Sequence, residues 1–273
     1  MIKDITLGQF FPGNTVIHKL DPRMKIVLTI AYIVAIFMAT NVYSFIAVAL
    51  SAVLLVIMSG ISWKTIIKSM KPLIFVLAFT TFFNLFWTTG DVLLVSFWKV
   101  NIYLEGVIFS VMMILRITAL LVGTTILLTY TTSPIMLTDA LERLLAPLRK
   151  IKLPVHEFSM MMTIALRFIP TLIEETDKIM SAQKARGADF ESGSLMKRAK
   201  ALVPILIPLF ISAFRRADEL ATAMECRCYR GGDGRTRMTR LKLSGRDLTA
   251  AAVMTLFIAG IVSLNMIPTP IAL

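Results

Sequence analysis

Two arginines with small neighbours mark the ends of two amphipathic segments of this sequence. They stand in the tripeptides Ala185-Arg186-Gly187 and Cys226-Arg227-Cys228. A planar guanidinium can donate several directed hydrogen bonds to carboxylates or carbonyls, and a cation is favoured at the negative end of a helix. Small neighbours allow the surface of another protein to approach the backbone. The two tripeptides therefore suggest plugs that dock into grooves of partner proteins.

The segments before these arginines share a helical phase. An offset of 41 residues aligns 172–187 with 213–228. At about 100° per residue each segment forms one stripe. The stripes are Leu172, Thr176, Ile179 and Gln183 in the first segment and Ala213, Ala217, Leu220 and Met224 in the second. Glycines after each arginine, at 187 and at 231–232, predict that the arginines lie in last turns. Because helix ends attract arginine anyway, the pattern alone supports docking and a purely structural role equally.

Composition places these segments in a membrane protein. The 273 residues are 56% hydrophobic and only 17% charged, and the mean hydropathy of +0.76 is too high for an ordinary soluble domain. A net charge of +12 could indicate nucleic-acid binding. Lys and Arg beside membrane spans explain this charge more simply, because they favour the cytoplasmic side. We therefore expect contact with membrane lipid and none with nucleic acid.

Five apolar runs are long enough to cross a hydrocarbon core of about 30 Å. They cover residues 24–40, 43–59, 72–89, 104–131 and 247–267. Asp21 can cap the first run, and Pro22 fits its first turn. The sequence thus predicts an all-α polytopic membrane protein with about five transmembrane helices plus long cytoplasmic helices. Its expected parts are a membrane region at 1–131, a cytoplasmic helical region at 132–246, and a last span with its tail at 247–273.

The distribution of charge predicts the orientation. The turn at 40–43 is uncharged, whereas the next loop carries Lys64, Lys68 and Lys71. The loop at 91–103 has a single lysine, and 132–246 holds 20 of the 29 Lys and Arg residues. Since positive residues favour the cytoplasmic side, we expect the N-terminus inside and the C-terminus outside.

Arg116 lies near the middle of the fourth run, where a charge is costly unless it faces protein or finds a partner. It could help to conduct a polar solute. Packing against a neighbouring helix or a headgroup is the favoured interpretation, because no acidic residue lies within the interior of the other spans.

The sequence offers little for catalysis. No glycine-rich loop ends in Gly-Lys-Ser or Gly-Lys-Thr, so no nucleotide site of that type is expected. His156-Glu157 and His18 are isolated, which favours solvated or capping roles. Cys226 and Cys228 are too close for an easy disulfide and too few for structural zinc. We expect no catalytic residue, no cofactor and no metal site.

Four stretches resemble a known family. They are HKLDPRMK at 18–25, LRFIPTLIEE at 166–175, QKARGADF at 183–190 and RRADELATAMECRCYRGG at 215–232. Together they are similar to EcfT, the transmembrane coupling subunit of energy-coupling factor transporters of the ABC type, and the similarity covers most of the chain.

The resemblance implies a non-catalytic subunit in a bacterial cell membrane. In that family, cytoplasmic coupling helices end in two arginine motifs that dock two ABC-type ATPase subunits. A small integral-membrane substrate-binding protein, the S component, is held beside them and delivers a vitamin or another micronutrient. The first motif corresponds to Ala185, Arg186 and Gly187. The second, at Cys226, Arg227 and Cys228, keeps the arginine but departs from alanine and glycine, which leaves open how closely a partner approaches there.

The same resemblance suggests contacts with the S component. Apolar side chains that suit an exchangeable partner are Met160, Met161, Met162, Ile205, Leu206, Leu209 and Phe210, although core packing or lipid contact explains each of them as well. Pro170, Pro204 and Pro208 could break the coupling helices into segments or simply end helices. Three other functions stay open: the permease of an ordinary ABC transporter, a self-contained membrane channel or carrier, and a membrane enzyme acting on lipid phosphates.

Overall fold

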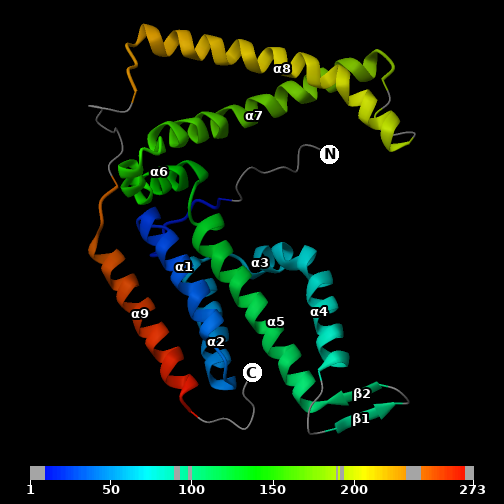
Figure 1. The fold of residues 1–273 in the computed structure, drawn as a ribbon, viewed down its shortest axis with the longest axis vertical. Helices are drawn as coiled ribbons and strands as arrows, with labels where there is room; N and C mark the ends of the chain where they lie inside the picture. The colour runs from blue at the N-terminus through cyan, green and yellow to red at the C-terminus, as the bar shows by residue number, and fades with distance from the viewer. Residues whose placement is uncertain are drawn as a thin grey trace. The chain divides into compact units, whose positions relative to one another are not determined.

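The computed structural model describes residues 10–88, 93–97, 100–188, 190, 194–231 and 241–267. Its α-helices are α1 (Pro22–Met38), α2 (Val42–Ser59), α3 (Trp63–Met70), α4 (Ile74–Trp87), α5 (Leu104–Thr124), α6 (Pro134–Leu144), α7 (Val155–Ala185), α8 (Leu195–Cys226) and α9 (Gly245–Asn265). Two 3₁₀ turns, η1 (Lys71–Leu73) and η3 (Ala146–Ile151), a π-helix, η2 (Thr125–Tyr130), and two strands, β1 (Leu93–Phe97) and β2 (Val100–Tyr103), complete the described elements (Figure 1).

The described residues form two compact units. The first, here called the bundle unit, contains residues 10–137 and 241–267. The second, called the crossed-helix unit, contains the described residues from 138 to 231. The chain therefore leaves the bundle unit within α6 and returns to it before α9.

Four helical segments of the bundle unit are long and apolar enough to cross a membrane. They are Val42–Ser59, Trp63–Trp87, Leu104–Tyr130 and Gly245–Asn265. These segments match four of the five predicted runs, and the all-α membrane architecture is confirmed. The remaining run corresponds to α1, which has 17 residues, at the lower limit of about 17–25 residues for a span.

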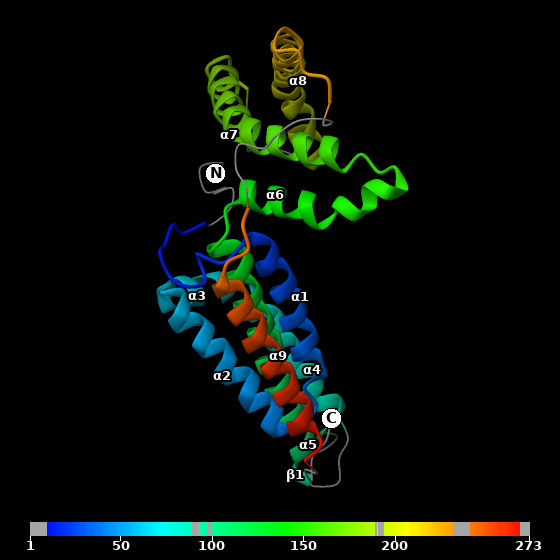
Figure 2. The same cartoon turned by 90° about the vertical axis from the view of Figure 1, so that its left-hand side faces the viewer.

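Both ends of α1 are hydrogen-bonded to the corresponding ends of α9. At the first end, the Asp21 backbone N–H donates to Asp247 Oδ1 at 2.8 Å. At the other end, Asn265 Nδ2 donates to the Met38 carbonyl at 2.6 Å. Since α9 is long enough to span the membrane, α1 runs beside it over the same depth and in the same direction, as both views show (Figures 1 and 2). We therefore assign α1 as the fifth span.

The start of α1 follows the predicted cap. Asp21 Oδ1 accepts a hydrogen bond from the Arg23 backbone N–H at 2.9 Å, and Pro22 occupies the first helical position. The carboxylate satisfies one of the free N–H groups of the first turn, and proline has no N–H to satisfy there.

Two segments that the sequence suggested as loops have regular structure. The three lysines after the first hairpin lie on α3 and η1, because Lys64, Lys68 and Lys71 recur at helical spacing while Ile66 is buried on the other side. In the loop expected at 91–103, β1 pairs with β2 as an antiparallel hairpin. The lysine of that loop, Lys99, and its neighbour Trp98 lie outside the described residues.

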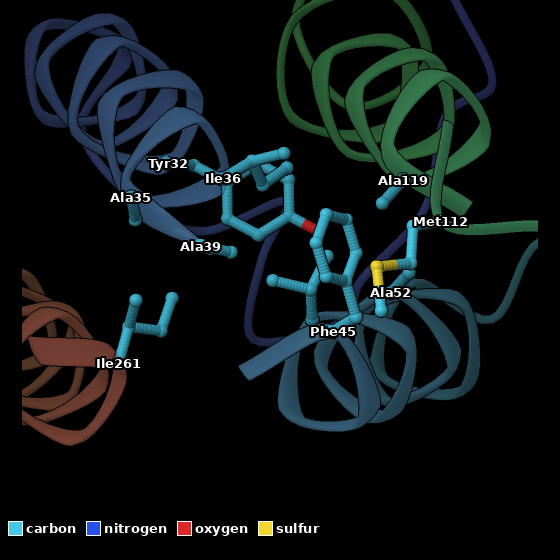
Figure 3. Packing of buried hydrophobic residues seen from close by; sticks show 10 residues of the cluster. Tyr32, Ala35, Ile36, Ala39, Phe45, Ala52, Met112, Ala119 and Ile261 are labelled. Atoms are coloured by element: carbon cyan, nitrogen blue, oxygen red, sulfur yellow. The ribbon is translucent and has the colours of Figure 1, made fainter. Parts of the chain in front are cut away.

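The core of the bundle unit lies where α1, α2, α5 and α9 meet. Figure 3 shows the Tyr32 ring of α1 reaching toward Phe45 of α2, with Met112 and Ala119 on α5 and Ile261 on α9 around them. All five side chains are buried. In water, burying a large apolar side chain stabilises a fold by about 1.5–3 kcal/mol. Between helices in lipid, removal of apolar surface from water contributes less to stability, so close packing is the main contribution.

The crossed-helix unit is dominated by two long helices, α7 with 31 residues and α8 with 32. They pack against each other and cross, and their C-terminal ends lie at opposite ends of the crossed pair (Figure 1). Pro170 lies inside α7, and Pro204 and Pro208 lie inside α8. The prolines therefore do not end these helices, and each removes one internal hydrogen bond and favours a kink; both helices are bent along their length (Figures 1 and 2).

Candidate partner-docking site

The first arginine tripeptide forms the C-terminal end of α7. Arg186 is the capping residue after Ala185, and Gly187 follows with φ +87°. The Gly187 N–H donates to the Lys184 carbonyl at 3.0 Å, and the Ala188 N–H donates to the Gln183 carbonyl at 3.0 Å. These two bonds define a Schellman motif, in which a left-handed residue lets the chain turn back and satisfy the last carbonyls.

The second tripeptide ends α8 with the same pattern. Arg227 is the capping residue, the Cys228 N–H donates to the Glu225 carbonyl at 2.8 Å, and the Tyr229 N–H donates to the Met224 carbonyl at 3.0 Å. Every residue of this motif lies 41 positions after its counterpart in α7. The sequence offset therefore corresponds to two equivalent helix ends with an arginine at the same place in each.

Cys228 takes the left-handed position that glycine takes in the first motif. Its φ is +56°, a conformation that costs a residue with a Cβ roughly 1–2 kcal/mol more than glycine. The sequence suggested that Gly231 and the next glycine stop α8, but the helix ends before them, at Cys226. The second motif therefore has the same backbone geometry as the first although cysteine stands in place of glycine, and Cys228 bears the strain.

Both arginine ends are accessible. All six residues of Ala185-Arg186-Gly187 and Cys226-Arg227-Cys228 are exposed, and a Cβ built on Gly187 meets no atom within 4 Å. Each arginine also occupies the capping position at the C-terminal end of its helix, where the helix dipole favours positive charge. The arrangement presents two cations on small, open helix ends, which suits carboxylates or carbonyls of a partner.

One ion pair joins α7 and α8 where they cross. Arg216 Nη2 lies 3.3 Å from Glu175 Oε2. Arg186 lies 11 residues after Glu175, and Arg227 lies 11 residues after Arg216. At about 1.5 Å per residue, each arginine stands about 16 Å along its helix beyond the crossing. The predicted stripes of both segments are half-buried, apart from the exposed Ala217.

The apolar residues suggested for a second partner differ in exposure. Met161, Met162, Leu206 and Phe210 are exposed, whereas Met160 and Leu209 are half-buried. Ile205 is only 4% exposed, because its own chain covers it. Ile205 is therefore not part of the exposed apolar surface, which retains the other six residues.

Arg116 has a structural role in the bundle unit. Its Nη2 donates to the Ala39 carbonyl at 2.7 Å, and its guanidinium lies 5.0 Å from the centre of the Phe45 ring. Ala39 caps the end of α1, so a cation there meets the negative end of the helix dipole. The packing interpretation of Arg116 fits this geometry.

Both histidines also have structural contacts. His156 Nδ1 lies 3.0 Å from Glu142 Oε1 and ties the start of α7 to α6. His18 Nδ1 lies 2.7 Å from Thr15 Oγ1, and its Nε2 lies 3.0 Å from the Phe11 carbonyl oxygen. The sequence suggested solvated or capping roles, whereas these contacts join each histidine to another side chain or to a carbonyl of its own unit.

Sequence reasoning missed a buried polar cluster in the bundle unit. Lys25 is 1% exposed, Asp247 is 2% exposed, and Thr131 and Thr132 are 3% exposed. In the sequence, Lys25 stands only near the start of the first apolar run and Asp247 only at the start of the last. The signal available in the sequence was a lysine inside the first apolar run, where a charge is costly unless it finds a partner.

Comparison with known proteins identifies the family of this chain. The family model CbiQ, described as a cobalt transport protein, matches residues 13–238. The chain is 49% identical over 267 residues to the energy-coupling factor transporter transmembrane protein EcfT of Ruminiclostridium cellulolyticum, covering 98% of this chain and 99% of that one. It is 55% identical over 252 residues to EcfT of Clostridium kluyveri, with 92% and 93% covered. EcfT of Thermosediminibacter oceani is 52% identical over 261 residues, with 95% and 97% covered. Because the family model matches most of the chain and these relatives are about half identical over nearly its whole length, this chain belongs to the EcfT family of energy-coupling factor transporter transmembrane proteins.

Proposed function

We propose that this protein is the coupling subunit of an energy-coupling factor transporter. It would transmit ATP-driven motion from two ABC-type ATPase subunits to a membrane-embedded S component that takes up a vitamin or another micronutrient. The chain itself would contribute no catalytic residue and no cofactor, because the partners hydrolyse ATP.

One observation carries the proposal: α7 and α8 end in equivalent Schellman motifs with an exposed arginine at the capping position. Two equivalent ends suit two equivalent or closely related partners. An arginine whose neighbours are small can enter a groove and make charge-assisted hydrogen bonds there. Arg186 and Arg227 would therefore each dock one ATPase, with Ala185, Gly187, Cys226 and Cys228 allowing the close approach.

The exposed apolar surface of the crossed-helix unit suits the S component. Methionine is flexible and polarizable, so Met161 and Met162 can repack against different partners. Leu206 and Phe210 add apolar area on α8, and both are exposed. These four residues, with the half-buried Met160 and Leu209, would form the contact.

The orientation follows from the positive-inside bias and from the arrangement of the spans. Five spans that start inside end outside, and residues 132–246 carry most of the positive charge. The N-terminus and the crossed-helix unit would thus be cytoplasmic, where the ATPases bind, and the C-terminus would lie outside.

The test is affinity purification of the tagged chain from its native membrane in mild detergent. We expect two ABC ATPase subunits and a small apolar membrane protein to co-purify with one copy of this chain. Arg186→Glu and Arg227→Glu should each reduce the recovered ATPase about tenfold or more, because each places a repelling charge in a docking contact. The double variant should recover none while still inserting into the membrane.

Matched controls reverse a charge elsewhere on the same helices. Lys178 on α7 and Arg215 on α8 are exposed and lie outside the tripeptides, so Lys178→Glu and Arg215→Glu should leave ATPase recovery unchanged. The proposal fails if the wild-type chain purifies alone, or if the control variants lose the ATPases as strongly as the arginine variants.

A further inference from the structure

The first turn of α1 binds the segment through which the chain leaves the bundle unit. Lys25 Nζ donates to the Thr131 carbonyl at 2.7 Å, to Thr131 Oγ1 at 3.2 Å and to Thr132 Oγ1 at 3.2 Å. Thr131 and Thr132 lie just after η2 and only a few residues before the chain enters the crossed-helix unit. Lys25 thus holds the outgoing connection.

The same turn of α1 binds the segment through which the chain returns. The Asp21 backbone N–H donates to Asp247 Oδ1 at 2.8 Å. The other oxygen, Asp247 Oδ2, accepts the Ser244 backbone N–H at 2.7 Å and so caps α9. Arg23 Nη2 donates to the Leu241 carbonyl at 3.0 Å. The incoming connection is therefore anchored to α1 over its first described residues.

Lys25 and Asp247 place opposite charges in the interior of the unit, and each binds a different connection. Burying two charges is costly, and a well-packed apolar pair of similar size often stabilises a fold as well or better. Stability alone therefore does not require these two buried charges. Their position is better explained by their contacts, because both connections to the crossed-helix unit are hydrogen-bonded to the first turn of α1.

The outgoing connection follows an unusual element. Thr125–Tyr130 forms the π-helix η2, which continues α5 up to the residue before Thr131. π-helical segments are rare and frequently lie at functional sites. Lys25 therefore binds the two residues that directly follow such a segment.

We propose that Lys25 and Asp247 are positioning residues for transport, which transmit the motion of the crossed-helix unit to the membrane helices. The five residues Asp21, Lys25, Thr131, Thr132 and Asp247 form the junction cluster. The inference rests on the proposed coupling function, because it assumes that nucleotide binding by the ATPases moves α7 and α8. Lys25 acts on η2 and α5, and Asp247 acts on α9.

The test compares hydrogen exchange in two nucleotide states of the purified complex. The complex is reconstituted in nanodiscs of phosphatidylethanolamine and phosphatidylglycerol, and mass spectrometry follows peptides in Mg-ADP and in the non-hydrolysable analogue Mg-AMP-PNP. In the wild type, we expect the analogue to change exchange in α7 and α8 and also in peptides covering 125–133 and 241–248.

Lys25→Met should separate these responses. The change in α7 and α8 should remain, and ATP hydrolysis by the complex should stay within about twofold of the wild type, whereas the change at 125–133 and 241–248 should shrink about fivefold or more. Lys25→Arg should restore part of it, because arginine keeps the charge and the donors. Lys64→Met, which removes an exposed lysine from α3, should behave as the wild type.

If Lys25→Met prevents folding, Thr132→Val replaces it, since it removes one acceptor and leaves the bond from Lys25 to the Thr131 carbonyl. For this variant we expect a smaller decrease in the exchange response of the peptides covering 125–133 and 241–248. The inference is overturned if Lys25→Met, or Thr132→Val in its place, leaves the bundle peptides responding as in the wild type, or if Lys64→Met loses the response equally. It is also overturned if the wild-type analogue response stops at α7 and α8. Absence of any ATPase in the wild-type preparation would instead refute the proposed coupling function.

Discussion

The Arg216 guanidinium lies 3.3 Å from the Glu175 carboxylate, and these two residues occupy equivalent positions in segments offset by 41 residues. Helices that touch at equivalent positions are related by an approximate twofold arrangement at the contact. The two capping arginines, each 11 residues further on, are therefore placed symmetrically about one ion pair. The two proposed docking ends therefore lie at equal distances along their helices from this ion pair.

Exchanging the charges of this pair should restore the stability that either single reversal lowers slightly. Arg216→Glu and Glu175→Arg should each lower the free energy of unfolding by about 1 kcal/mol or less, because the pair is partly exposed and screened by solvent. The double exchange should recover most of this loss. Thermal unfolding of the four proteins in detergent gives the coupling energy. Simple addition of the two single effects would contradict the contact.

The left-handed residues of the two Schellman motifs should respond in opposite ways. Gly187→Ala should destabilise the end of α7 by about 1 kcal/mol, since alanine disfavours φ near +87° even where space is free. Cys228→Gly should stabilise the end of α8 by up to about 1 kcal/mol, because it removes strain that cysteine bears there. Hydrogen exchange of the Ala188 and Tyr229 amides in the isolated chain measures both effects. A slower Tyr229 amide in Cys228→Gly is expected, and a faster one would refute the strain.

Gly123 should be intolerant of any side chain. A Cβ built on it would lie 2.1 Å from Tyr32 Cε1, since α5 and α1 approach closely there. Gly123→Ala should therefore destabilise the bundle unit by about 1–3 kcal/mol. Tyr32→Leu in the same chain should relieve the clash and recover part of the loss. Gly260→Ala on α9 is the matched control, because a Cβ there meets no atom within 4 Å; an equal loss in the control would show that the approach of Tyr32 is not the cause.

Arg116 should matter for stability and not for the passage of a solute. Arg116→Met removes the hydrogen bond to the Ala39 carbonyl and the contact with Phe45, so the free energy of unfolding should fall by about 1–3 kcal/mol. Arg116→Lys should lose less, because it keeps a cation near the end of α1. Thermal unfolding in detergent checks both variants. Unchanged stability in Arg116→Met would favour a role in conduction instead.

The sequence by itself determined the class of protein and the positions of its main elements. Apolar runs of span length locate membrane helices because a helix must be about 20 residues long to cross lipid. The phase of the segments before Arg186 and Arg227 identified two equivalent helix ends, since the stripe recurs every 3.6 residues or so. The helical prediction for α7 and α8 is confirmed, whereas the docking of partners at their ends stays a prediction.

Local signals were less reliable where a tertiary contact decides the outcome. Lys64, Lys68 and Lys71 suggested a loop, yet burial of Ile66 stabilises a helix there. Glycines at 231–232 suggested the stop of α8, yet Cys228 takes the left-handed position. Ile205 has the composition of a contact residue, but its burial follows only from the packing of its own chain.

Only the tertiary structure decided which distant residues meet. Lys25 with Thr131, Asp21 with Asp247 and Glu175 with Arg216 are separated by 106, 226 and 41 positions. Helical periodicity specifies which residues share a face of one helix. It does not specify the register between two helices, because that register depends on how their side chains fit together. For this reason the two arginine ends could be read from the sequence, whereas the junction cluster became visible only in the folded chain.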